Sequence, residues 1–134
     1  MLWQQKLFKV LGEFGITQTQ YAILASLLWF EEHHEPATQA HLIEHTKIDK
    51  MTISKSIRKL EVAGFVLRTQ SATDARAMEV EFTAFGRGQI RKAIVAVENA
   101  DEEFFSCLTA AQLNAYRSLT ISIIAGNSLA GLFK

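Results

Sequence analysis

The order of apolar and polar positions along the chain predicts a mainly helical protein with one short β-hairpin. Apolar residues recur every three or four positions in most of the chain, which is the spacing of amphipathic helices. Residues 78–83 instead alternate apolar and polar side chains, as a half-buried strand does. The predicted elements, in order, are helices over residues 2–13, 18–30, 39–45 and 49–64, strands over 65–68 and 78–83, and two helices that follow Thr83 and Thr109.

Hydroxyl and carboxylate residues mark the starts of these helices. Thr17 and Thr109 are each followed three residues later by Gln, the spacing of a capping box. Thr38, Asp49 and Thr83 each precede a helical stretch and are expected to be N-cap residues. Two short helices joined by about four residues, followed at once by a hairpin, indicate a helix-turn-helix with a wing.

The second helix of this motif, residues 49–64, has two unlike faces. Ile53, Ile57, Leu60 and Gly64 fall in one narrow sector, which is the pattern of a core-facing stripe. The opposite side carries cations and short hydroxyl side chains but no acid, which is unusual for a solvated helix face. We interpret it as a recognition helix for duplex DNA. The predicted DNA contacts on this face are Met51, Thr52, Ser54, Lys55, Arg58 and Lys59.

The distribution of charge supports this interpretation although the net charge is zero. Residues 47–92 hold ten Lys or Arg against five Asp or Glu, whereas the remainder holds four against nine. A basic middle between acidic ends is an electrostatic footprint that the total conceals.

Composition sets further limits on the chain. Its 134 residues are enough for one domain with a hydrophobic core, and 49% apolar residues exclude a disordered chain. One cysteine permits no internal disulfide, and the N-terminus lacks the cleavage region of a signal peptide, so we expect a cytoplasmic protein. The apolar run over residues 119–133 is too short and too polar to cross a bilayer, so no membrane partner is expected. We instead expect the last helix to be buried on several sides.

In order and spacing, several short motifs together resemble the MarR family of winged-helix transcriptional regulators, over nearly the whole chain. Each motif is weak alone. They are Thr17 with Gln20-Tyr21, Ile48-Asp49, Thr52-x-Ser54, Leu60-Glu61-x-x-Gly64-Phe65-Val66-x-Arg68, Asp74-Ala75-Arg76, and Val80-x-Phe82-Thr83-x-x-Gly86.

The resemblance implies one MarR-like domain over residues 1–134 that acts as a homodimer on a pseudo-palindromic DNA site. Residues 17–92 would form the winged helix-turn-helix lobe, and residues 1–14 and 100–134 would form dimerisation helices. The wing tip would carry Arg76 toward the minor groove, and Asp74 would orient that arginine or the wing backbone. A ligand-responsive repressor without enzymatic activity or cofactor is the implied function.

Two other interpretations use different residues. A winged helix can also serve as a protein-interaction module, with its basic face idle. Residues 41–45 match the HxxEH arrangement of one class of zinc peptidase, but no third ligand is evident downstream. A metal-sensing regulator that uses the region from His33 to His45 is a more credible alternative than a metalloenzyme, although surface histidines are the simpler explanation of the pattern.

A cysteine and several aromatic residues complete the set of candidates. Cys107 has apolar neighbours, which favours a buried and inert thiol. Relatives in the MarR family often bind small, frequently aromatic ligands between the dimer helices and the DNA-binding lobe. Phe14, Tyr21 and Trp29 are the residues expected to line such a pocket, with core packing as the simpler alternative.

Overall fold

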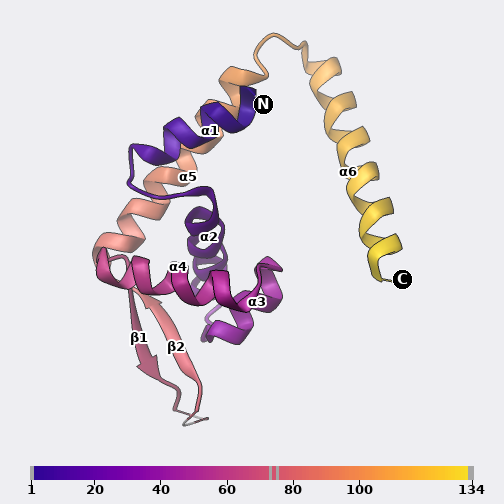
Figure 1. The fold of residues 1–134 in the computed structure, drawn as a ribbon. Helices are drawn as coiled ribbons and strands as arrows, with labels where there is room; N and C mark the ends of the chain where they lie inside the picture. The colour runs from indigo at the N-terminus through magenta and orange to yellow at the C-terminus, as the bar shows by residue number, and fades with distance from the viewer. Residues whose placement is uncertain (1, 73, 75, 133–134) are drawn as a thin grey trace. The chain divides into compact units, whose positions relative to one another are not determined.

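The computed structural model describes residues 2–72, 74 and 76–132, with residues 124–132 by their backbone alone. It contains helices and one hairpin in the predicted order (Figure 1). Their bounds are α1 Leu2–Gly12, α2 Gln18–Glu32, α3 Gln39–Thr46, α4 Lys50–Val62, β1 Val66–Gln70, β2 Met78–Phe82, α5 Ala84–Phe104 and α6 Ala110–Leu132. The chain divides into two compact units, residues 1–100 and residues 101–134, and α5 crosses the boundary.

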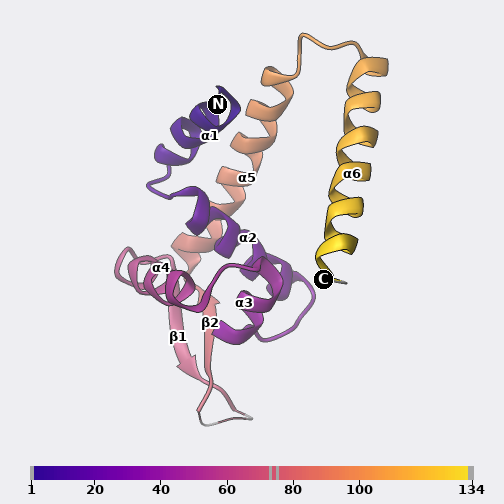
Figure 2. The same ribbon diagram turned by 45° about the vertical axis from the view of Figure 1, so that its right-hand side comes forward.

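The first unit is built around α2, which contacts α1, α3, α4 and β2 (Figure 2). One hydrophobic cluster draws on all of these elements and on α5. Its side chains with less than 2% exposure are Leu11, Ile23, Leu24, Leu42, Ile53, Ile57, Leu60, Val66 and Ile90. The three short helices α2, α3 and α4 therefore share one core with the base of the hairpin.

The burial of α2 differs from the expectation in detail. The spacing of apolar residues in α2 predicts that Ala22 and Trp29 lie on buried sides of the helix, but Ala22 is exposed and Trp29 is 39% exposed. Ile23 and Leu27 are buried instead. A helix that is enclosed by four neighbouring elements buries most of its circumference. The model of an amphipathic helix with one apolar stripe therefore does not predict which of its residues are buried.

The predicted helix caps are present. The Thr17 hydroxyl accepts a hydrogen bond from the Gln20 amide at 3.1 Å, and the Gln20 side chain accepts one from the Thr17 amide at 2.9 Å. Thr109 and Gln112 make the same pair of bonds. At Thr38 the reciprocal acceptor is the imidazole of His41, 3.2 Å from the Thr38 amide, rather than a carboxamide.

The hairpin is a two-stranded antiparallel sheet in which Val66 pairs with Phe82 and Gln70 with Met78. The first strand begins one residue later and ends two residues later than predicted. The segment before α3 joins the sheet, since the Val80 amide donates to the Ala37 carbonyl at 2.7 Å and Thr38 forms a bridge with Glu79. These bonds fix the base of the wing to the start of the helix-turn-helix.

A tight joint connects the hairpin to α5. The Thr83 amide donates to the Phe65 carbonyl at 3.1 Å, and the Thr83 hydroxyl accepts from the Gly86 amide at 2.9 Å. A Cβ atom at position 86 would lie 1.9 Å from the Phe65 carbonyl oxygen. Only glycine therefore lets the first turn of α5 approach the backbone of Phe65 this closely.

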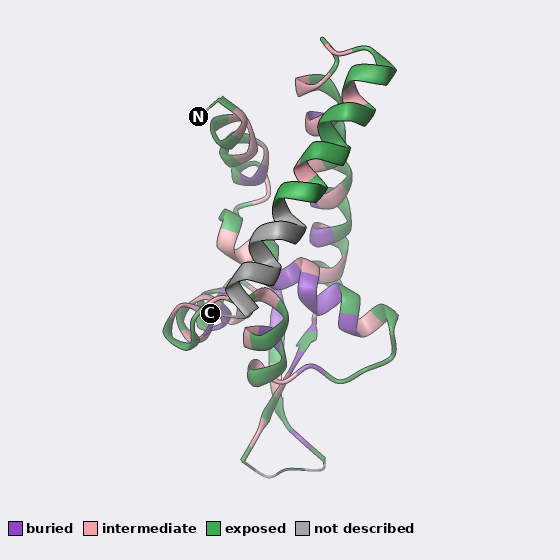
Figure 3. Ribbon diagram, turned by 90° about the vertical axis from the view of Figure 1, so that its right-hand side faces the viewer, coloured by how far each residue is buried: buried purple, intermediate pink, exposed green. Residues whose placement is uncertain are grey.

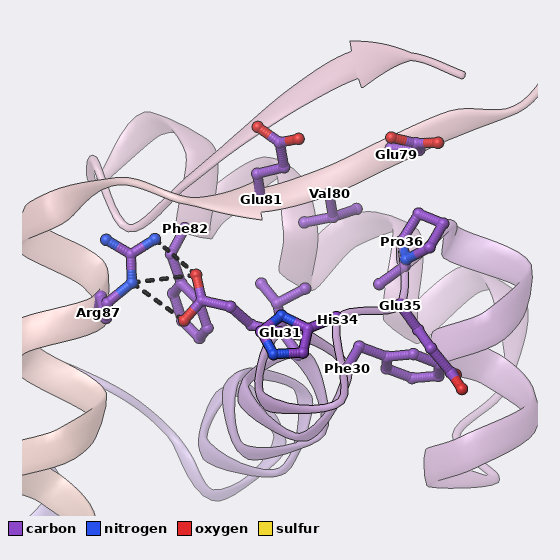
Figure 4. A pocket seen from close by; sticks show the side chains of 12 residues that line it. Phe30, Glu31, His34, Glu35, Pro36, Glu79, Val80, Glu81, Phe82 and Arg87 are labelled. Atoms are coloured by element: carbon purple, nitrogen blue, oxygen red, sulfur yellow. Dashed lines mark hydrogen bonds and ion pairs between the residues drawn. The ribbon is translucent and has the colours of Figure 1, made fainter. Parts of the chain in front are cut away.

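An ion pair ties α5 to the end of α2 (Figure 4). Arg87 Nε lies 3.0 Å from both carboxylate oxygens of Glu31, and Arg87 Nη2 lies 2.5 Å from Glu31 Oε1. These bonds lower the pKa of Glu31 below its ordinary value, with further help from the charges of Arg87 and Arg91, while partial burial opposes the shift. The carboxylate is thus more stable in the folded chain than in the unfolded one.

The second unit consists of the end of α5 and α6. Phe105 packs on Tyr116 with ring centroids 5.1 Å apart. The expectation that α6 is buried beyond Leu119 is not met within the single chain (Figure 3). Leu119, Ile121 and Ile123 are 64–65% exposed, and the rest of the apolar run lies outside the described side chains. Among the described residues, no helix has the length and apolar character to cross a membrane.

We predict that Gly86→Ala lowers the free energy of unfolding by about 1–3 kcal/mol, because the new methyl group displaces the Phe65 backbone. Gly88→Ala is the matched control, since its Cβ would meet nothing within 4 Å. In the interior of α5 that change should leave stability unchanged or raise it by up to about 1 kcal/mol. Urea unfolding followed by circular dichroism measures both changes. Equal effects of the two substitutions would contradict the close approach of α5 to the Phe65 backbone at Gly86.

We predict that Glu31→Gln lowers stability near neutral pH and that the loss disappears in acid. Because the folded-state pKa of Glu31 is lowered, its contribution is fully present above the ordinary value near 4.5 and is lost as the pH falls below it. Melting temperatures of wild type and variant should converge across that range. Glu32→Gln, at an exposed neighbour, is the control and should follow wild type. A difference that persists unchanged in acid would show that the carboxylate charge is not the cause.

Candidate nucleic-acid interface

The start of α4 is fixed by Asp49, as predicted. Its carboxylate accepts hydrogen bonds from the Thr52 hydroxyl at 2.6 Å and from the Thr52 amide at 3.0 Å. These two bonds, the hydroxyl first, hold the pKa of Asp49 below its usual value. Lys47, in the left-handed conformation with φ of 60°, ends α3 and turns the chain toward this cap. The helix-turn-helix connection is therefore specified locally.

The two faces of α4 are arranged as the sequence predicts. Ile53, Ile57 and Leu60 have exposures of 0, 0 and 1% and form the underside. On the outer side Met51 is 68% exposed, and the side chains of three cations are also exposed. Those cations are Lys55, Arg58 and Lys59. The buried stripe thus orients the cationic side chains toward solvent.

Ion pairs divide the cations of residues 47–92 into a paired group and an unpaired group. Lys47 pairs with Glu44 at 2.9 Å, Arg68 with Glu61 at 3.0 Å, and Arg87 with Glu31. Across the described residues, Lys55, Arg58 and Lys59 form no ion pair with an acidic side chain. Three cations without an acidic partner in the described part of the chain thus share the outer face of α4.

The two hydroxyl residues predicted for this face are less free than the cations. Thr52 donates its hydroxyl hydrogen to Asp49, and both Thr52 and Ser54 are half-buried. Thr52 can still accept a hydrogen bond, but it has no hydrogen left to donate. The Thr52-x-Ser54 motif in the sequence did not predict this contact of Thr52 with the N-cap residue Asp49.

The tip of the wing presents an arginine held by its neighbour. The Asp74 carboxylate accepts from the Arg76 amide at 3.0 Å and lies 3.9 Å from Arg76 Nε. The Asp74 amide in turn donates to the Ser71 hydroxyl at 3.3 Å. The Arg76 side chain is 96% exposed. The predicted contact between Asp74 and Arg76 is therefore present, while Ala75 lies outside the described residues.

A positioning pair at the root of the wing was not identified from the sequence. Arg68 on β1 donates to both carboxylate oxygens of Glu61 on α4, at 3.0 and 3.4 Å. This bidentate pair sets the direction of the hairpin relative to the helix. The opposite charges on either side of the Gly64 turn are the signal that could have indicated it.

A hollow of about 340 Å³ separates the start of α3 from the wing tip. Its lining residues include Gln39 and Ala40 in the first turn of α3, together with Arg76 and Asp74 at the wing tip. First-turn amides and a guanidinium both favour an anion, and a DNA phosphate has that chemistry. The hollow, the outer face of α4 and Arg76 make up the candidate nucleic-acid interface.

Comparison with known proteins agrees with this geometry. A family model described as "ArnR1-like, winged-helix domain" matches residues 12–100. The HTH-type transcriptional regulator YdcH of Bacillus subtilis (strain 168) is 33% identical over 104 residues, which cover 78% of this chain and 71% of that protein. An HTH-type transcriptional repressor of Mycobacterium tuberculosis (strain H37Rv) is 28% identical over 109 residues, covering 81% of this chain and 76% of that one.

The fold also matches a solved structure of mutant MarR from Escherichia coli complexed with operator DNA. Its TM-score is 0.76 at 20% identity, over 90% of this chain and 84% of that one. The chain belongs to the family of ArnR1-like winged-helix domains, and it has the MarR fold. The relatives that it matches are named HTH-type transcriptional regulators or repressors.

Three of the four histidines of this MarR-type chain make structural contacts. His45 Nδ1 is hydrogen-bonded to the buried Ser26 hydroxyl at 2.6 Å, and His33 Nδ1 to the Trp29 carbonyl at 2.7 Å. His41 Nδ1 takes part in the cap at Thr38. Across the described residues, no group of three His, Cys, Asp or Glu side chains is placed so that it could hold a metal ion. The geometry thus gives the metal-sensing alternative no support.

The structure also places Cys107 and the predicted pocket residues of this MarR-type chain. Cys107 is exposed, so the expectation of a buried thiol was wrong; it follows Phe104, the last residue of α5, where the chain turns away from the helical stripe. The residues predicted to line a ligand pocket, Phe14, Tyr21 and Trp29, lie in different surroundings. Phe14 and Tyr21 pack against the core, whereas Trp29 is partly exposed near the other end of α2. Burial, and then the charge of Glu98, raise the pKa of Tyr21.

We predict that Arg68→Gln and Arg76→Gln affect this winged-helix protein differently in the absence of DNA. Arg68→Gln should lower the free energy of unfolding by up to about 1 kcal/mol, because it breaks the partly exposed pair with Glu61. Arg76→Gln should leave it unchanged, because that side chain is almost fully solvated. Urea unfolding of the two variants gives the comparison. A larger loss for Arg76→Gln would indicate that the wing tip serves the fold.

Proposed function

We propose that the chain is a homodimeric, sequence-specific binder of double-stranded DNA that regulates transcription as a repressor in the cytoplasm, without catalytic activity. The observation that carries this proposal is the outer face of α4, where three cations have no acidic partner among the described residues. Lys47, Arg68 and Arg87, by contrast, each pair with an acid. A polyanion is the partner that such a face fits.

The arrangement of side chains suggests a division of roles along α4. Met51 and Lys55 lie toward its N-terminal half, the part of a recognition helix that reaches base edges in the major groove. A lysine can donate to guanine, and a methionine can pack on a thymine methyl group. Arg58 and Lys59 lie further along and suit contacts to phosphates. Arg76 on the wing suits a narrow minor groove.

The homodimer is proposed from the apolar side chains that the single chain leaves exposed. Leu119, Ile121 and Ile123 on α6 project into solvent, although aliphatic residues at this density usually form an interface. Residues 1–14 and 100–134 are the segments we assign to dimerisation. Two recognition helices related by a two-fold axis would read half-sites about 10 base pairs apart.

Repression and ligand response are the finer parts of the proposal. Relatives of this chain include one described as a transcriptional repressor, and occlusion of a promoter is the simplest output of a small DNA-binding dimer. A ligand that changes the spacing of the two recognition helices would release the DNA. Of the three predicted pocket residues, Trp29 lines a hollow of the single chain. Phe14 and Tyr21 would contact a ligand only in a second hollow that a partner subunit completes.

We predict that Lys55→Ala weakens binding to a selected operator by about 1–3 kcal/mol and relaxes its base preference, because a contact to a base edge is lost. Lys59→Ala should weaken binding to all sequences alike and reduce the slope of log affinity against log salt by about one. Fluorescence anisotropy on a selected and a mixed-sequence duplex, over a series of salt concentrations, measures both. Lys92→Ala, at an exposed cation on α5, is the control and should bind as wild type does.

Binding to duplex DNA that is weak and independent of salt would contradict the proposal. The basic face would then be idle, and a protein-interaction module would explain the winged helix better. Equal losses for Lys55→Ala and Lys59→Ala on both duplexes would keep DNA binding but contradict the division of roles along α4.

A further inference from the structure

A second kind of site lies where α2 ends beside α3 (Figure 1). A hollow there has a volume of about 360 Å³, within the range of small-molecule sites. We call it the α2–α3 hollow and define it by its lining residues Trp29, Phe30, Glu35, His41, Glu44 and His45. It contains aromatic rings and carboxylates and no cationic Lys or Arg.

The rings of the α2–α3 hollow form a connected set. The Trp29 ring lies 5.1 Å from Phe30 and 5.0 Å from His45, and the Phe30 ring lies 5.4 Å from His45 and 5.9 Å from His41. Trp29 is 39% exposed, so part of its surface is open to a ligand. Rings at these distances and inclinations provide several π surfaces around one space.

Hydrogen bonds fix these rings before any ligand arrives. His45 is held by the Ser26 hydroxyl, and His41 by the backbone at Thr38. Trp29 stacks on His33 with centroids 4.0 Å apart, and His33 is itself bonded to the Trp29 carbonyl. A ligand would therefore meet a largely preformed wall, which lowers the entropic cost of binding.

The two carboxylates give the hollow a negative rim. Glu44 is shared with the exposed Lys47, whose side chain is 74% exposed, so that pair is weak. Glu35 forms no ion pair with a cation in the part of the chain that the structure describes. Aromatic faces and carboxylates both attract positive charge, and both disfavour an anion.

The neighbouring hollow in Figure 4 differs in charge. It shares Phe30 and Glu35 with the α2–α3 hollow and has further aromatic rings and glutamates, but the Arg87 guanidinium lines it and pairs with Glu31. The α2–α3 hollow, whose lining contains no Lys or Arg, therefore favours a cation more clearly.

We propose that the α2–α3 hollow binds an organic cation, a quaternary ammonium or protonated amine group carried on a hydrophobic body. The inference deepens the ligand-responsive part of the proposed function, because it names the class of ligand. Binding is tested on the full chain without DNA, so its failure leaves the proposal of DNA binding untouched, and failure of DNA binding leaves the ligand site untouched.

Three probes with one benzyl body separate charge from shape. Benzyltrimethylammonium is the cation, 2-methyl-1-phenylpropan-2-ol is its uncharged counterpart, and phenylacetate is the anion. Isothermal titration calorimetry should show that the cation binds about tenfold more tightly than the alcohol, with phenylacetate weakest. In NMR spectra the indole resonance of Trp29 should shift, while that of Trp3 stays in place.

Variants locate the binding. Trp29→Leu should weaken the cation about tenfold, and Glu35→Gln about threefold, while neither changes the affinity for the alcohol as much. Glu35 is exposed, so Glu35→Gln tests the site without risk to the fold. Glu32→Gln, at an exposed acid outside the hollow, is the control. Equal affinity for cation and alcohol, tighter binding of phenylacetate, or insensitivity to both variants would overturn the proposal.

Discussion

Burial of three aliphatic side chains beneath α4 is the interaction on which the rest of the structure depends. Ile53, Ile57 and Leu60 are almost completely removed from solvent. By fixing the rotation of α4 about its axis, they determine which residues remain outside. The cap at Asp49 and the bond between Arg68 and Glu61 then fix the beginning of the helix and the direction of the wing. A core contact therefore sets the geometry of a surface that is itself mostly polar.

Acidic residues have a corresponding role in the electrostatics. The segment that carries most of the basic residues also lies against acids that neutralise a part of them, at Glu31, Glu44 and Glu61. Three of the cations left without an acidic partner among the described residues share one helix face, the outer face of α4. Neither the net charge nor the charge of residues 47–92 shows which cations are neutralised, because that depends on which side chains meet in three dimensions. A neutral chain can in this way present a strongly positive surface.

The order of elements, the caps and the two faces of α4 could be predicted because each depends on residues close together in sequence. Thr17, Thr38, Asp49 and Thr109 act within three positions of themselves. What could not be predicted depends on contacts across the chain. The faces of α2 were misassigned because four elements surround that helix, and the pairing of Arg87 with Glu31 joins positions far apart. The exposure of Cys107 and of the apolar side chains on α6 likewise depends on which neighbours are present.

The bond from the Thr52 hydroxyl to Asp49 has a consequence for the base contacts that we propose for α4. With its hydrogen directed at the carboxylate, the Thr52 oxygen offers lone pairs alone. Such an oxygen repels phosphate oxygens and the carbonyl groups of guanine and thymine. It can, however, receive a bond from the exocyclic amino group of adenine or cytosine. A cap that begins a helix can thus also give one position of that helix a fixed polarity toward bases.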